Sequence, residues 1–134
     1  MDEGIAIEII WDDGDLKMIV IDAANGRFRA HAEAYAGAGE LARIAGVIAG
    51  FPSGPRDVRE VAVGTAQLRF FCREETLGHS MVEIKCVGGT DEYPEQANFF
   101  LAVETKAIED WVRQLRAVGE RKEIPAVLHA GREP

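Results

Sequence analysis

Several residue types that mark common protein classes are scarce in this 134-residue chain. Two cysteines, Cys72 and Cys86, are too few for the disulfide framework of a small secreted domain, and they fit a reducing cytoplasm. No apolar run approaches the ~20 residues that a transmembrane helix needs. The first residues, Met1-Asp2-Glu3, are acidic where a secretory signal peptide would be basic. We therefore expect a cytoplasmic protein.

The residues that usually carry catalysis or bind metals form no recognisable motif. None of the histidines, at positions 31, 79 and 129, stands at ligand spacing from another ligand-type residue. The two serines, Ser53 and Ser80, lie outside any G-x-S-x-G motif. Gly37–Ala42 matches G-x-G-x-x-A, but the preceding strand has a polar face and Glu40 would repel phosphate. We predict no catalytic residue, no metal and no cofactor, and the sequence favours a non-enzymatic protein.

The charge of the chain is strongly acidic and unevenly distributed. The formal net charge is −8, and residues 1–26 carry seven acidic residues against Lys17 alone. Such a surface repels the phosphates of nucleic acids and membranes and attracts a basic protein. The same excess would also keep the chain soluble without any partner. We predict no nucleic-acid or membrane binding.

The stretch Leu16–Tyr35 predicts a β-hairpin around which the rest of the chain packs. Asn25-Gly26 at its centre is typical of a tight two-residue turn, because both residues tolerate positive φ. After the turn, polar residues alternate with an apolar set, which is the period of a strand with one buried face. That apolar set is Phe28, Ala30, Ala32 and Ala34. Because the alanines are small, we expect the helix predicted over residues 41–51 to lie against them.

The remaining pattern predicts an α+β protein. A strand pattern precedes the hairpin at residues 5–11, and further strand patterns follow the first helix between residues 58 and 103. A second amphipathic helix begins near Thr105, whose hydroxyl can cap it, and ends at Gly119. We expect an antiparallel sheet of about six strands with both helices packed on one face, in the order β-β-β-α-β-β-β-α. Residues 1–119 would form a single domain, and residues 120–134 a loosely ordered tail.

A second surface is predicted on the outward faces of the later strands. Strand parity places Phe71, Met81 and Phe100 on the side away from the core. Exposed aromatic residues on a sheet mark a surface covered by a partner, by the tail or by a second copy of the chain. We therefore expect a partner face or a homodimer face there.

The last strand and helix resemble a known group of proteins. Residues 98–104 (NFFLAVE), followed by residues 108–115 (IEDWVRQL), are similar to small uncharacterised bacterial proteins near the WapI-type immunity protein family. The resemblance implies a cytoplasmic, non-enzymatic protein of sheets and helices that neutralises a toxin domain by binding it. No binding residues can be transferred, because the likeness is one of pattern.

The resemblance and the charge together suggest a binding mode. An inhibitor of a toxin that degrades nucleic acid would present carboxylates where phosphates otherwise lie. We predict that this acidic partner-binding surface consists of Glu8, Asp12, Asp13, Asp15 and Asp22. Two alternatives stay open: a small-molecule-binding protein with its ligand between sheet and helices, and an enzyme without a recognisable motif.

Overall fold

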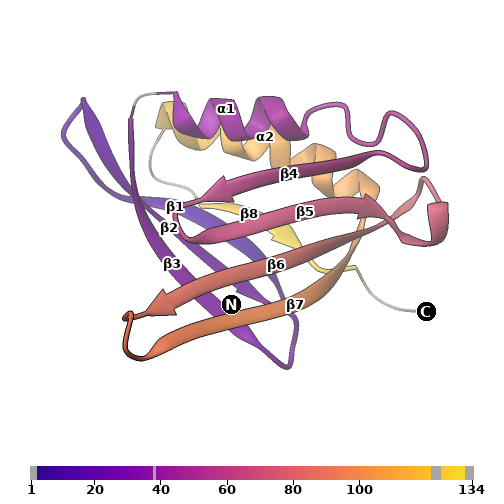
Figure 1. Cartoon of the computed structure of the whole chain (residues 1–134). Helices are drawn as coiled ribbons and strands as arrows, with labels where there is room; N and C mark the ends of the chain where they lie inside the picture. The colour runs from indigo at the N-terminus through magenta and orange to yellow at the C-terminus, as the bar shows by residue number, and fades with distance from the viewer. Residues whose placement is uncertain (1–2, 38, 122–124, 132–134) are drawn as a thin grey trace.

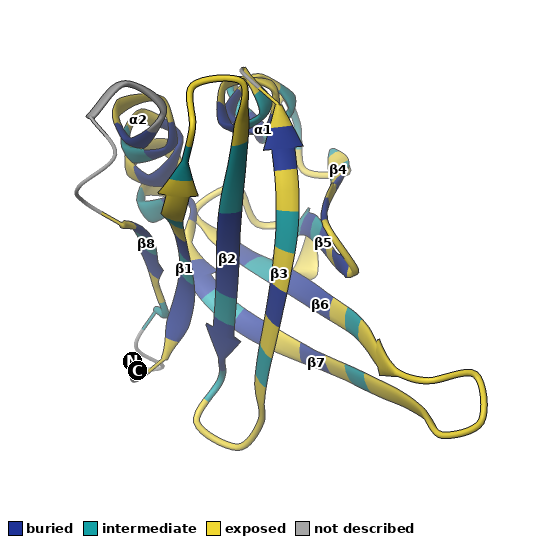
Figure 2. Ribbon diagram, turned by 90° about the vertical axis from the view of Figure 1, so that its left-hand side faces the viewer, coloured by how far each residue is buried: buried dark blue, intermediate teal, exposed yellow. Residues whose placement is uncertain are grey.

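The structure, a computed structural model, describes residues 3–37, 39–121 and 125–131. The described strands form two antiparallel sheets of four, in the orders β3-β2-β1-β8 and β4-β5-β6-β7. The sheets cross steeply, and the two α-helices lie side by side along one side of the molecule (Figures 1 and 2). The elements in chain order are β1 (Gly4–Asp12), β2 (Leu16–Ala24), β3 (Arg29–Gly37), α1 (Glu40–Ile48), β4 (Val58–Val63), β5 (Ala66–Cys72), a 3₁₀ turn (Arg73–Glu75), β6 (His79–Gly89), β7 (Pro94–Glu104), α2 (Thr105–Arg121) and β8 (Ala126–His129).

The predicted class is confirmed, and the predicted sheet is not. The chain is α+β with antiparallel strands and two α-helices among its described residues. The expected single sheet of about six strands is instead two sheets, because α1 and the loop after it carry the chain from one layer to the other. The part after α1 supplies four strands before α2, and β8 then returns to the first sheet. Alternation identifies the buried side of each strand but not which strands pair.

The predicted hairpin is present, with a longer turn than expected. β2 pairs with β3 as far as Ala24 and Arg29, so four residues form the loop. The side-chain oxygen of Asn25 accepts the amides of Arg27 and Phe28, at 3.0 and 2.9 Å, and Gly26 has φ of +93°. An asparagine side chain can thus close a turn by mimicking backbone. Phe28, expected on the buried face of the strand, lies in this loop and is 60% exposed.

The alanine face of β3 packs against the second sheet, not against a helix. Helix α1 lies mainly against α2 and β4. A Cβ placed on Gly64, in the β4–β5 turn, would lie 2.8 Å from the Cβ of Ala34. Near Ala32, the Cys86 thiol of β6 donates to the carbonyl of His31 at 3.9 Å. The small residues therefore allow two sheets to approach closely, and our expectation that a helix would use them is wrong.

Helix α1 is held by its apolar face and by an arginine from β4. Its buried residues recur at helical spacing and are Leu41, Ile44, Ala45 and Ile48. The Arg59 guanidinium donates to the carbonyls of Val47, at 3.1 Å, and of Ala49, and it pairs with Asp57 at 2.9 Å. α1 has no basic residue in its own last turn. Arg59 therefore supplies the positive charge that stabilises the C-terminal end of a helix.

Helix α2 packs its predicted apolar stripe into the core between the layers. Trp111 is fully buried and lies 6.2 Å from Phe70, measured between ring centroids. Thr105 is the first residue of the helix, but its hydroxyl bonds outward to the carbonyl of Leu77 at 2.6 Å and to Ser80 at 2.8 Å. The hydroxyl therefore ties the helix start to β6. The core itself is filled by large apolar side chains, among them Ile5, Ile7, Ile44, Phe70, Trp111, Leu115 and Leu128.

Residues assigned by sequence to a loose tail take part in the first sheet. α2 continues through Gly119 to Arg121, and Ala126–His129 form β8, antiparallel to β1. Ala126 and Leu128 are fully buried. The Gln114 side chain accepts the Val127 amide at 2.8 Å and donates to the Val127 carbonyl at 3.2 Å. Residues 122–124 and 132–134 of the predicted tail lie outside the described residues.

Within the described part of the chain, the helices are too short or too polar to cross a lipid bilayer.

Candidate protein-binding face

The outer face of the first sheet combines exposed aromatic residues with carboxylates. Pairing across β1, β2 and β3 places Trp11, Met18 and Tyr35 in one row. Trp11 is 49% exposed and Tyr35 is 65% exposed. Ile10 and Leu16, also exposed, adjoin this row at the same end of the sheet. We call these five residues the aromatic row.

Carboxylates lie next to the aromatic row on the same face. In the next row of outward-facing residues, strand pairing places Glu8, Val20 and Glu33 side by side, so Val20 lies between two acidic residues. The next row pairs Asp22 with His31. The face is therefore apolar at one end and acidic in its middle, which suits a partner with apolar and basic side chains.

A β-bulge brings Trp11 to this face. The pairing of β1 with β2 shifts between Ile9 and Trp11. Strict alternation from Ile5 and Ile7 would turn Trp11 into the core, whereas the extra residue turns it outward. Sequence reasoning therefore missed Trp11, because nothing in the local sequence marks the bulge. Tyr35 could have been found, since it shares the parity of the polar residues of β3.

The predicted acidic cluster is divided by the structure. Glu8 and Asp22 lie on the outer face, in adjacent rows of neighbouring strands. Asp12 turns inward after the bulge: its side chain is 6% exposed, lies 3.9 Å from the Lys17 amine and accepts the Gly14 amide.

The other two predicted acids belong to the β1–β2 turn. The carboxylate of Asp13 accepts the amides of Asp15 and Leu16, at 3.0 and 2.7 Å, so it holds the turn together. Asp15 is exposed at the tip. The structure therefore brings together Glu8, Asp22 and the unpredicted Glu33, and it gives Asp12 and Asp13 local roles.

The imidazole of His31, on this face, lies between two carboxylates. Its Nδ1 lies 2.8 Å from Asp22 and its Nε2 lies 3.5 Å from Glu33. The hydrogen bond to Asp22 is the main cause that raises the pKa of His31, with a smaller contribution from Glu33. His31 therefore stays protonated to a higher pH than a free histidine and partly neutralises the two acids beside it.

Comparison with known proteins leaves the chain without an assigned family. No protein-family model and no curated protein matches it. Among solved structures, it is similar to a chain of the MRP1/MRP2 structures of Trypanosoma brucei. That likeness has 11% sequence identity and a TM-score of 0.45, and it covers 84% of this chain and 74% of the other. A likeness this slight carries no argument about function.

The other predicted surface is on the outer face of the second sheet. Phe71 and Met81 are direct neighbours in the pairing of β5 with β6. The Phe100 ring, from β7, meets the Phe71 ring edge to face at 6.4 Å between centroids. The Arg69 guanidinium lies over the Phe71 ring, 4.6 Å from its centroid. The three residues that parity placed outward are therefore one contiguous cluster.

Open hollows lie at the surface of the described part of the chain. One, of about 1070 Å³, is a groove between the β2–β3 turn, β7 and residues 129–131. Its polar lining includes Glu3, Asn25, Arg27 and His129. The space between sheets and helices, where the small-molecule alternative would place a ligand, is filled by the apolar core. Among the described residues, no three side chains of His, Cys, Asp or Glu are grouped to hold a metal ion.

Proposed function

We propose that this protein is a non-enzymatic binding protein that captures a basic protein partner on the outer face of its first sheet, as an immunity or inhibitor protein does. The single observation that carries the proposal is the aromatic row with Glu8 and Glu33 beside it. Tryptophan and tyrosine are among the residues that most often dominate the binding energy of protein interfaces.

The carboxylates set the expected charge of the partner. Glu8, Asp22 and Glu33 lie on the face itself, and the chain as a whole carries −8. A basic partner would be attracted before contact, and opposite charges would fix its orientation. The acidic surface and the resemblance to immunity proteins support an inhibitor of an enzyme that acts on phosphate-rich substrates. Part of the acidity comes from Asp12 and Asp13, which act within the β1–β2 turn and are not offered to the partner.

The proposal is tested by site-specific photo-crosslinking in the cells that produce the protein. A photoreactive phenylalanine analogue replaces Tyr35 in one variant and Tyr93, which is exposed on the β6–β7 tip, in the control. We expect one predominant adduct with a basic protein from position 35 and none from position 93. Absence of an adduct at position 35, or the same adduct at both, contradicts the proposal.

The captured partner is then used to test the residues of the face. Trp11→Ala and Tyr35→Ala should each weaken binding at least about tenfold. Glu8→Lys combined with Glu33→Lys should abolish most of the attraction and its salt dependence. Glu109→Lys on the exposed side of α2 is the matched control and should leave affinity nearly unchanged. Binding that survives the Glu8 and Glu33 reversal contradicts the assignment of this face.

A further inference from the structure

We propose that the outer face of the second sheet is a self-complementary surface on which a second copy of this chain docks, forming a two-fold symmetric dimer. This face lies on the opposite side of the molecule from the aromatic row, because the two sheets pack by their inner faces. The inference does not depend on the proposed partner of the first sheet.

The first observation is that this face is nearly balanced in charge in a strongly acidic protein. Its outward charged residues on β4, β5 and β6 are Glu60, Arg69, Glu83 and Lys85, two of each sign, and Glu104 at the end of β7 lies 3.3 Å from His79. Two copies that each carry −8 repel one another over most of their surfaces. They can approach most easily where the local charge is close to zero, and this face combines such a charge with exposed apolar side chains.

The second observation is the order of side chains across the strands. Pairing places Val58, Phe71, Met81 and Ala102 in one row, and Glu60, Arg69, Glu83 and Phe100 in the next. Consider a two-fold axis that lies between the copies, runs parallel to the strands and passes midway between β5 and β6. It places β5 of one copy over β6 of the other, and it places each row over the same row of the second copy. Arg69 then faces Glu83 of the second copy, and Phe71 faces its Met81. The reciprocal contacts are identical, which is the requirement of an isologous dimer.

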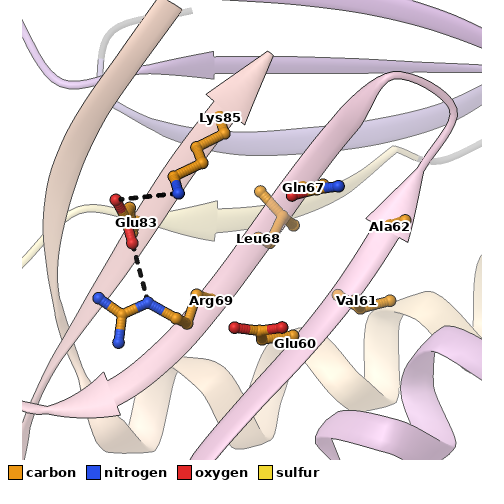
Figure 3. A pocket seen from close by; sticks show the side chains of 8 residues that line it. All are labelled: Glu60, Val61, Ala62, Gln67, Leu68, Arg69, Glu83 and Lys85. Atoms are coloured by element: carbon orange, nitrogen blue, oxygen red, sulfur yellow. Dashed lines mark hydrogen bonds and ion pairs between the residues drawn. The ribbon is translucent and has the colours of Figure 1, made fainter. Parts of the chain in front are cut away.

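The third observation is that the same axis brings Phe100 of one copy close to a hollow on the other copy. Figure 3 shows the hollow, about 280 Å³, between β4, β5 and β6, where Ala62 leaves room beside Glu60 and Gln67. Phe100 is 47% exposed on β7. The axis carries β7 of one copy over β4 of the other, so Phe100 reaches the second copy beside Glu60 at the border of this hollow.

The Arg69–Glu83 pair already exists within each copy, with the Arg69 side chain 37% exposed and the Glu83 side chain 11% exposed. Arg69 Nε lies 2.8 Å from Glu83, and the Lys85 amine lies 4.0 Å from the other oxygen of the same carboxylate (Figure 3). The hydrogen bond from Arg69 lowers the pKa of Glu83, so this carboxylate stays ionised. Both side chains are thus held in place before docking, which reduces the ordering cost of association.

A dimer of this kind would present two aromatic rows on opposite ends of one particle. A partner that carries two binding sites, or is itself dimeric, would then be held by both ends, and its apparent affinity would exceed that of one face.

The test is sedimentation velocity of the purified full-length chain and its charge variants. We expect the unmodified protein to dimerise, and Arg69→Glu and Glu83→Arg each to be monomeric at concentrations where it is dimeric, because each variant sets like charges opposite one another. Circular dichroism checks that the variants fold. Arg113→Glu, at an exposed α2 residue paired with Asp110, makes the same charge change away from the face and should remain dimeric.

Mixing the two variants distinguishes a contact between copies from a role within one chain. In the mixture, two acidic positions of one variant face two basic positions of the other, so a heterodimer should form although neither variant dimerises alone. The double variant R69E/E83R should also dimerise. A chain that stays monomeric at about 1 mM, the range of weak association constants, overturns the proposal. So does a dimer that tolerates R69E, or a mixture that remains monomeric.

Discussion

At the scale of single residues, His31 offsets part of the negative charge on the outer face of the first sheet. Asp22 and Glu33 both contact the imidazole, at 2.8 and 3.5 Å. His31 pairs with Asp22 across the strands and is two residues from Glu33, so a protonated imidazole between these two acids reduces their mutual repulsion. A partner bearing its own positive charge would compete with His31 for the same carboxylates, which couples partner binding to pH.

The first prediction concerns the titration of this histidine. Because its folded-state pKa is raised, the stabilisation that it gives is fully present below the unfolded-state value of about 6.5 and is lost as the pH rises through the higher folded-state value. Asp22→Asn removes the main cause and should lower the pKa of His31, as followed by NMR of its ring protons. Glu33→Gln should lower it less. An unchanged pKa in Asp22→Asn would contradict this account.

At the scale of elements, the close contact between β3 and the β4–β5 turn fixes the distance between the two sheets. Gly64 occupies this contact with φ of +60°, and the Cβ that an alanine would add meets Ala34. Ala30, Ala32 and Ala34 of β3 are small, and this lets the backbone of the second sheet approach β3 closely. Larger side chains on either layer would force the sheets apart.

The second prediction tests this contact. Gly64→Ala should lower the free energy of unfolding by about 1–3 kcal/mol, through overpacking against Ala34 and through the strain of a left-handed φ, as measured by urea denaturation. Adding Ala34→Gly should recover part of the loss, because the two positions share the contact. Gly46→Ala is the control: it lies within α1 with nothing within 4 Å and should stabilise the protein by about 0.5–1 kcal/mol. Equal effects at Gly64 and Gly46 would contradict the packing described.

The elements themselves were largely predictable from the sequence, and their pairing was not. The hairpin followed from Asn25-Gly26 and the alternation after it, and helix α2 followed from its apolar stripe. Alternation also placed Phe71, Met81 and Phe100 on one outer face. Alternation did not determine the register of β5 with β6, in which Phe70 pairs with Val82, because that register depends on the 3₁₀ turn over Arg73–Glu75.

The candidate site was predicted only in part, for a physical reason. The sequence shows where acidic residues are, but not whether a carboxylate faces solvent or closes its own turn. A carboxylate oxygen of Asp13 accepts the backbone amides of its own turn, and the bulge turns Asp12 inward. The same bulge exposes Trp11. A shift of one residue exchanges the two faces of a strand, and local sequence did not reveal that shift.

At the scale of the whole molecule, β8 joins the two ends of the described chain. It pairs with β1, and Leu128 lies opposite Ile5. Gln114 of α2 binds the backbone of the same strand from the other side. The segment therefore closes the core at the junction of the first sheet and the second helix.

The third prediction measures how firmly this segment is held. Leu128→Ala should lower the free energy of unfolding by about 2–5 kcal/mol, because the leucine is fully buried. Val127→Ala, at the neighbouring position that faces outward and is half-buried, should cost much less. Urea denaturation of both variants provides the comparison. If both substitutions were neutral, residues 126–129 would be a loose tail, as their sequence first suggested.

The position of β8 also determines when the molecule can be completed during synthesis. β1 leaves the ribosome well before its second neighbour, β8, which is translated more than a hundred residues later. Until β8 is present, one edge of β1 is unpaired and the side chains of Ile5 and Ile7 are not fully covered. An unpaired strand edge beside exposed apolar side chains is prone to aggregation. Pairing between such distant segments is slow to form, and we expect the nascent chain to reach its final fold only after β8 has been translated.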